Sequence, residues 1–155
     1  MLVTLNTDAS FWYGVNKGAY AFWAKSNEFC IKKTGVFRQK CLCNTDAEAK
    51  AILNGLSTVC NASTFVTRII VNTDSIPAIA IFQRCKMVTA KDLAEWKWSH
   101  IYKVYMALLL RDNLTIEFRH VKAHNGTSDK RSFVNDWCDK NAKKSIKSKN
   151  KVYEN

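Results

Sequence analysis

Hydrophobic and polar positions in the first third of the chain follow the short, loosely alternating runs that are typical of β-strands. Such runs cover residues 2–8, 18–25 and 28–37, and Asn16 and Gly18 provide turn chemistry between the first two. Strands joined by turns this short pair in an antiparallel manner. We therefore expect an antiparallel three-stranded meander at the start of the chain.

Later in the chain the pattern changes to helices that alternate with strands. Four segments show helical character, and two runs of strand-forming residues lie among them. The expected helices are 45–60, 75–84, 99–111 and 132–146, and the expected strands are 65–72 and 114–121. Strands separated by helices join a sheet in parallel through right-handed crossovers. The predicted fold class is α/β, with a mixed five-stranded sheet flanked by helices, in one domain over residues 1–147.

Four carboxylates occupy positions that such a sheet could bring together. Asp8 is expected to end the first strand, and Asp74 to end the fourth. Glu48 lies one turn into the first helix, and Asp139 lies two turns into the last. Sites in α/β sheets form beyond strand ends near a switch in strand order. Clustered carboxylates repel one another unless cations lie between them, and oxygen ligands in this number favour Mg²⁺ or Mn²⁺. Paired metal ions of this kind cleave phosphodiesters.

Each acid also has a purely structural interpretation. Thr45-x-x-Glu48 fits a capping box at a helix start. Asp74 could cap the helix that follows it, and Asp8 could be a turn residue. Asp139 flanks the apolar face of its helix and could be an ordinary surface residue. Taken singly, each acid favours the structural interpretation, so the order of all four must decide.

Charge and composition indicate the class of partner. Twenty-four Lys and Arg against thirteen Asp and Glu leave a net charge of +11, which favours nucleic acid. Six of the lysines lie within residues 140–155, and residues 148–155 are expected to form a disordered basic tail.

No apolar run approaches the roughly 20 residues needed to span a membrane. The six cysteines include no CxxC pair and no secretory signal is visible, so we expect reduced thiols and a cytoplasmic location.

The ordered motifs resemble those of the type 1 ribonuclease H family over nearly the whole chain. The segments that carry the resemblance are "NTDAS" with Asp8, "NTDAEAKAIL" with Asn44 and Glu48, "VNTDS" with Asp74, and "HVKAHNG" followed by "NDWCDKNA", with His124, Asn135 and Asp139. The resemblance implies a ribonuclease H-like fold and an endonuclease that hydrolyses the RNA strand of RNA–DNA hybrids. It implies two Mg²⁺ ions, for which Mn²⁺ could substitute, and products with 5′-phosphate and 3′-hydroxyl ends. A stand-alone monomer is expected.

The resemblance also implies roles for the site residues. Asp8, Glu48, Asp74 and Asp139 would bind the two ions, with Asp8 bridging both. His124 would assist turnover through proton transfer or product release.

The resemblance places substrate contacts outside the acids as well. Ser10, Asn44 and Asn135 would contact the hybrid. Residues 85–98 stand where the family has a basic protrusion, and the side chains that could grip the DNA strand there are Lys86, Lys91, Trp96, Lys97 and Trp98. The alternative for both tryptophans is burial against the following helix.

The chain departs from the family pattern near two of the acids. Ala9 stands where family members usually have glycine, and Thr45 and Asp46 replace two residues of a common Asn-Asn-Arg run, of which Asn44 remains. Those positions contact the minor groove in relatives, so the departures bear on hybrid selectivity. Two other functions stay open: a nuclease of the same fold that cuts DNA junctions, and a noncatalytic nucleic-acid-binding module.

Overall fold

The computed structural model describes residues 1–111, 113–122 and 130–154, with the backbone alone at 130–133, 135 and 148–154. The elements in chain order are β1 (Leu2–Trp12), β2 (Lys17–Lys25), β3 (Cys30–Val36), α1 (Asn44–Ala62), β4 (Arg68–Thr73), α2 (Ile76–Cys85), α3 (Ala90–Leu93), α4 (Ser99–Leu109), β5 (Thr115–His120) and α5 (Lys130–Glu154). None of the helices in these ranges is long and apolar enough to cross a membrane.

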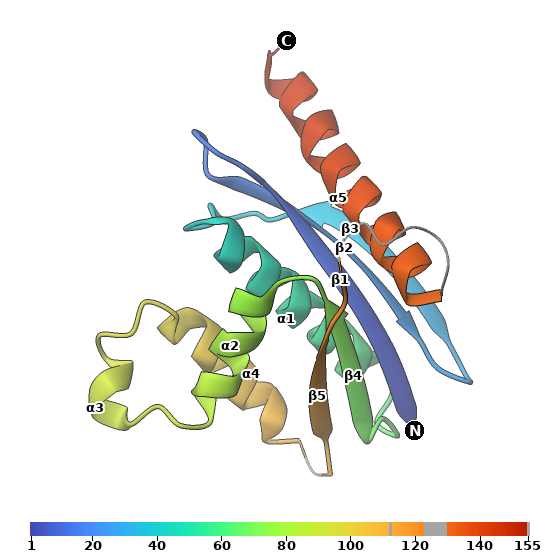
Figure 1. Ribbon diagram of the computed structural model, residues 1–155, viewed down its shortest axis with the longest axis vertical. Helices are drawn as coiled ribbons and strands as arrows, with labels where there is room; N and C mark the ends of the chain where they lie inside the picture. Colours follow the sequence, from blue (N-terminus) through green and yellow to red (C-terminus); the bar gives the residue numbers. More distant parts are fainter. Residues whose placement is uncertain (112, 123–129, 155) are drawn as a thin grey trace.

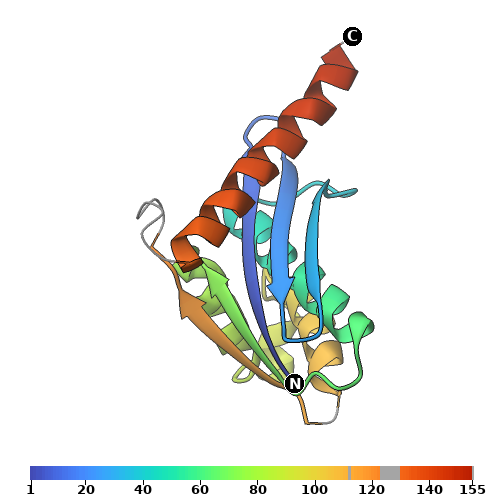
Figure 2. The same cartoon turned by 90° about the vertical axis from the view of Figure 1, so that its right-hand side faces the viewer.

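One five-stranded sheet in the order β3-β2-β1-β4-β5 forms the centre of the molecule (Figure 1). The β1–β2 and β2–β3 pairs are antiparallel, and the β1–β4 and β4–β5 pairs are parallel. Helices α1, α2 and α4 cover one face, and α5 crosses the other (Figure 2). The predicted meander followed by parallel strands is therefore confirmed.

Strand β1 is longer than the sequence predicts. It continues past Asp8 because it pairs with β2 as far as Trp12, which lies opposite Lys17. Its pairing with β4, in contrast, ends at Asn6. The expectation that Asp8 ends the strand is wrong: Asp8 lies within β1, just beyond the point where the parallel pairing stops. The tight turn after β1 instead uses residues 13–16, where Gly14 has a φ of 93°.

The main core lies between the sheet and helices α1, α2 and α4. Its largest fully buried side chains come from the sheet and from these three helices and are Phe22, Phe82, Tyr105, Leu5, Ile52, Leu56, Ile69 and Ile101. A second contact, made by Cys138 and Ala142 of α5 with Ala21 of β2, holds α5 on the opposite face. The two helical layers thus fix the sheet from both sides.

Gly55 allows α1 to approach β1 closely. A Cβ atom at this position would lie 2.9 Å from both Cδ atoms of Leu5. We expect Gly55→Val to lower the free energy of unfolding by about 1–3 kcal/mol, because it overpacks a filled core. Urea unfolding would measure the change, with Ser57→Val, a half-buried position two residues along α1, as the control. Equal losses in both variants would mean that any added β-branched side chain on α1, and not the contact with Leu5, sets the effect.

Helix α5 is also longer than expected. The sequence predicts a disordered tail from residue 148, whereas the helix continues to Glu154. No Pro or Gly occurs between Lys130 and Glu154, so nothing in the sequence ends the helix earlier. The boundary of the domain at residue 147 stays a prediction.

Candidate metal-binding and active site

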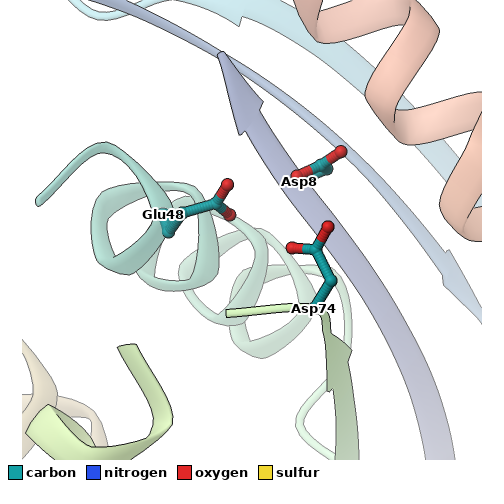
Figure 3. A group of neighbouring side chains, drawn as sticks. All are labelled: Asp8, Glu48 and Asp74. Carbon is teal, nitrogen blue, oxygen red and sulfur yellow. The ribbon is translucent and has the colours of Figure 1, made fainter. Parts of the chain in front are cut away.

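Three of the four predicted acids converge at the edge of the sheet where β4 ends. Asp8 comes from β1, Glu48 from α1, and Asp74 from the residue directly after β4. Each offers a carboxylate oxygen, and these oxygens all lie within 4.8 Å of one another. Figure 3 shows the three side chains pointing toward a common centre. Residues more than sixty positions apart in sequence therefore form one acid cluster, defined here as Asp8, Glu48 and Asp74.

Small side chains bring α1 close enough for Glu48 to join this cluster. Ala47 and Ala51 of α1 pack against Ala9 of β1 and Cys41, and all four are buried. Because Glu48 follows Ala47 directly, this close contact carries its carboxylate toward Asp8. Ala9, the position where the family usually has glycine, is thus part of the packing that forms the cluster.

Burial and mutual repulsion disfavour the ionised forms of the carboxylates in the cluster. Asp8 is 2% exposed, and burial, followed by the charges of Asp74 and Asp139, raises its pKa to about 8. Burial and the charges of Asp8 and Asp74 also raise the pKa of Glu48 well above its ordinary value. A divalent cation would relieve both penalties.

The donor set fits a hard divalent cation. Asp8 Oδ1 accepts a hydrogen bond from the amide of Ala9 at 2.9 Å. Asp8 Oδ2 and Glu48 Oε2 are buried and have no hydrogen-bond partner among the described residues. Buried carboxylate oxygens left without donors are suited to a metal, and an all-oxygen set favours Mg²⁺ or Mn²⁺.

The structural interpretations of these three acids do not hold. Residue Cys43, and not Thr45, is the N-cap of α1, so Glu48 does not belong to a capping box. Ser75 caps α2 by accepting a hydrogen bond from the amide of Ala78 at 3.2 Å, which leaves Asp74 outside the cap. Asp8 lies within a strand and not in a turn.

Asp139 lies near the cluster without being part of it. It belongs to α5, and its side chain is 22% exposed and forms an ion pair with Lys143 at 3.0 Å. It is not among the oxygens that lie within 4.8 Å of one another. Its negative charge nevertheless contributes to the raised pKa of Asp8. The fourth acid is thus within electrostatic reach of the first.

The remaining residues predicted to act beside the acids are only partly described. Ser10 lies two residues beyond Asp8 on β1, on the same side of the strand, and is half-buried. Asn44, the first residue of α1, is exposed. His124 and the side chain of Asn135 lie outside the described residues, so their roles stay predictions.

The predicted protrusion contains the short helix α3, which Thr89 caps by accepting a hydrogen bond from the amide of Asp92. Three lysines of this region are exposed, namely Lys86, Lys91 and Lys97. Trp96 and Trp98 are half-buried and pack against the main core, as the alternative interpretation anticipated. They fix the segment to the body of the protein, which leaves the lysines as its exposed basic groups.

The sequence analysis missed the role of Asp46. This carboxylate is fully buried and accepts hydrogen bonds from the Leu42 amide at 2.8 Å, Lys50 Nζ at 3.0 Å and His100 Nε2 at 2.7 Å. Burial alone would raise its pKa, but the hydrogen bonds from His100, Leu42 and Lys50 outweigh burial and hold the pKa below its ordinary value. Asp46 therefore fixes the start of α1, two residues before Glu48.

A pair of buried amides behind the acids was also missed. Asn6 and Asn72 lie opposite each other on β1 and β4, and both are buried. Each is two residues before an acid of the cluster, and Asn6 lies on the same side of β1 as Asp8. The signal was present in the sequence, because Asn-Thr-Asp occurs in both strands, at 6–8 and at 72–74.

Comparisons with known proteins agree with this geometry. A sequence model described as RNase H matches residues 2–147. The fold is similar to that of the N-terminal RNase H domain of Rv2228c from Mycobacterium tuberculosis, with 14% identity, a TM-score of 0.62, and coverage of 95% of this chain and 97% of that one. It is also similar to RNase H1 from Halobacterium salinarum, with 14% identity, a TM-score of 0.64, and coverage of 96% and 99%. A third similar structure is that of LC11-RNase H1, which was solved in complex with an RNA/DNA hybrid. It has 11% identity, a TM-score of 0.64, and coverage of 93% of this chain and 99% of that one. A search of curated proteins gives no match.

Proposed function

The chain belongs to the RNase H family, and from this premise we propose that it is an endonuclease that hydrolyses the RNA strand of RNA–DNA hybrids. The observation that carries the proposal is the cluster of Asp8, Glu48 and Asp74, in which burial and mutual repulsion disfavour the charged forms of Asp8 and Glu48 unless a cation is bound. The net charge of +11 supports a polyanionic substrate. One protein of the same fold was solved bound to an RNA/DNA hybrid, which supports the substrate class.

We assign the metal ligands from the cluster and its neighbour. Asp8, Glu48 and Asp74 would hold one divalent cation, and Asp8 with Asp139 would hold a second. Mg²⁺ is the expected ion, with Mn²⁺ as a substitute. When bound, such ions lower the pKa of water and stabilise negative charge on the phosphate. Hydrolysis would leave 5′-phosphate and 3′-hydroxyl ends.

Other residues of the chain would bind and orient the substrate. Asn44 is exposed at the start of α1, one turn from Glu48, where it can donate hydrogen bonds to the minor groove. Ser10 follows Asp8 on the same side of β1 and can contact the RNA strand. The exposed lysines of the protrusion would contact phosphates of the DNA strand. His124 would transfer a proton or speed product release.

Hybrid selectivity would depend on few residues in the turn before Glu48. Asp46 is buried and engaged by Leu42, Lys50 and His100, so it cannot contact nucleic acid. Asn44 is the exposed polar residue of this turn that matches the family. We therefore expect duplex RNA to be cut more slowly than the hybrid, but measurably.

A panel of labelled substrates tests the substrate class. The protein would be given RNA–DNA hybrid, duplex RNA, duplex DNA and a four-way DNA junction with Mg²⁺, beside Asp8→Asn. We expect the RNA strand of the hybrid to be cut at least about 100-fold faster than any other strand, since the 2′-hydroxyl and duplex shape are read together. Faster cutting of the junction would replace the proposal with a resolvase. Binding of the hybrid without cutting would replace it with a noncatalytic module.

A further inference from the structure

Helix α5 carries two opposite faces along the same stretch. One face is buried against the sheet through Cys138, Ala142 and Ile146, which are spaced four residues apart. The other is exposed and consists of Lys140, Lys143, Lys144 and Lys147, at the i, i+3, i+4 and i+7 positions of one helical face. We call these four residues the α5 lysine stripe. The helix is thus amphipathic with a cationic outer surface.

Most of the charge on the stripe is not balanced within the protein. Lys143 forms an ion pair with Asp139. Lys140, Lys144 and Lys147 form no ion pair with any residue that the structure describes. Four like charges on about two helical turns repel one another, so the stripe favours a polyanion.

The stripe spans a length over which a duplex presents several phosphates. Lys140 and Lys147 are separated by about 10.5 Å along the helix axis. Over the same length a double helix presents about six phosphates, at one charge per roughly 1.7 Å. The stripe also begins one residue after Asp139, and α5 carries it away from the acid cluster toward the end of the helix that projects past the sheet (Figures 1 and 2).

We propose that the α5 lysine stripe is a second nucleic-acid contact, which binds the phosphate backbone of duplex nucleic acid beyond the acid cluster. The inference rests on the proposed function in one respect, which is that the ligand is a nucleic acid. An anionic membrane surface fits less well, because membrane-binding helices insert an apolar face and that face of α5 is already buried against β2. Phosphate contacts carry no sequence information, so the stripe would bind hybrid and duplex DNA equally.

The test compares two triple variants with the same change in charge. Lys140→Gln/Lys144→Gln/Lys147→Gln removes the unpaired lysines of the stripe and leaves Lys143 in contact with Asp139. Lys25→Gln/Lys33→Gln/Lys103→Gln removes three exposed lysines from β2, β3 and α4. Binding of a 20-base-pair hybrid and a DNA duplex of the same length would be measured in EDTA between about 50 and 300 mM salt. Because EDTA removes the divalent cation that the proposed cleavage requires, binding is measured apart from catalysis.

The stripe variant should bind both duplexes at least about tenfold more weakly at 0.1 M salt, and the slope of log affinity against log salt should fall by about 2 to 3. In the control variant the slope should fall by less than about a third of the decrease expected for the stripe variant. Equal losses in the two variants would overturn the proposal, since total charge alone would then explain binding. An unchanged slope in the stripe variant would also overturn it. So would a loss of binding to vesicles of anionic lipid without a loss of binding to nucleic acid.

Discussion

Replacing Asp8 with Asn is expected to reduce cleavage of the hybrid by at least about 1,000-fold while making the metal-free protein more stable. Asp8 is the central ligand of the proposed site, and a thousandfold loss corresponds to about 4 kcal/mol of transition-state stabilisation. The same substitution removes a buried carboxylate that faces the charges of Asp74 and Asp139. Its removal should raise the free energy of unfolding by about 1–2 kcal/mol.

The gain in stability should depend on pH in a defined direction. The pKa of Asp8 is raised from 3.8 to about 8 in the folded protein, so the folded state favours the protonated form. Below about pH 4 Asp8 is protonated in both states and costs little. As the pH rises from about 4 to 8, its ionisation in the unfolded chain progressively destabilises the metal-free wild type. The advantage of Asp8→Asn should therefore be small near pH 4 and largest near pH 8.

Thermal unfolding in EDTA at several pH values would measure this effect, beside hybrid cleavage with Mg²⁺. Glu95→Gln is a suitable control, because Glu95 is exposed and distant in sequence from the cluster. Added Mg²⁺ should stabilise the wild type and should stabilise Asp8→Asn much less. An Asp8→Asn protein that is both active and less stable would show that Asp8 is a structural residue.

The second large effect separates two acids that lie two residues apart on α1. Glu48→Gln is expected to reduce cleavage activity by at least about 100-fold, and its free energy of unfolding should be unchanged or higher. Asp46→Asn is expected to lower the free energy of unfolding by about 1–3 kcal/mol while the folded fraction remains active. The reason is that Glu48 Oε2 has no hydrogen-bond partner among the described residues, whereas Asp46 accepts three hydrogen bonds.

Urea unfolding and cleavage rates at a temperature where both variants are folded would test the pair. Each variant is the control for the other, since both neutralise one buried acid of the same helix. If both lost activity and stability together, the assignment of separate roles on α1 would be wrong. If Asp46→Asn alone lost activity while fully folded, Asp46 would belong to the site.

The topology and the acid cluster were accessible from the sequence because both depend on local patterns. Short turns fixed the antiparallel strands, and helices between later strands fixed the parallel ones. Asp74 lies three residues after the apolar run that ends at Val71, and Glu48 has a clear place one turn into its helix. These signals placed three acids at one sheet edge, where the structure has them.

Features that depend on contacts between distant segments were not accessible. The length of β1 is set by β2 and not by β1 itself, so Asp8 was wrongly taken as a strand end. The hydrogen bonds of Asp46 at the start of α1 include one with His100, which is 54 residues away. The burial of Trp96 and Trp98 depends on the core beneath them. In each case the local sequence supports two interpretations, and only tertiary packing selects one.

The central claim is that the acid cluster hydrolyses the RNA strand of a hybrid with the help of a divalent cation. The most direct test is the single-turnover rate of RNA-strand cleavage as Mg²⁺ is titrated at constant ionic strength, for the wild type and for Asp8→Asn purified in parallel. We predict no cleavage in EDTA, a rate that rises and saturates with Mg²⁺, products with 5′-phosphate and 3′-hydroxyl ends, and at least about 1,000-fold slower cleavage by the variant. Cleavage that persists in EDTA, or that proceeds equally fast in Asp8→Asn, would contradict the account.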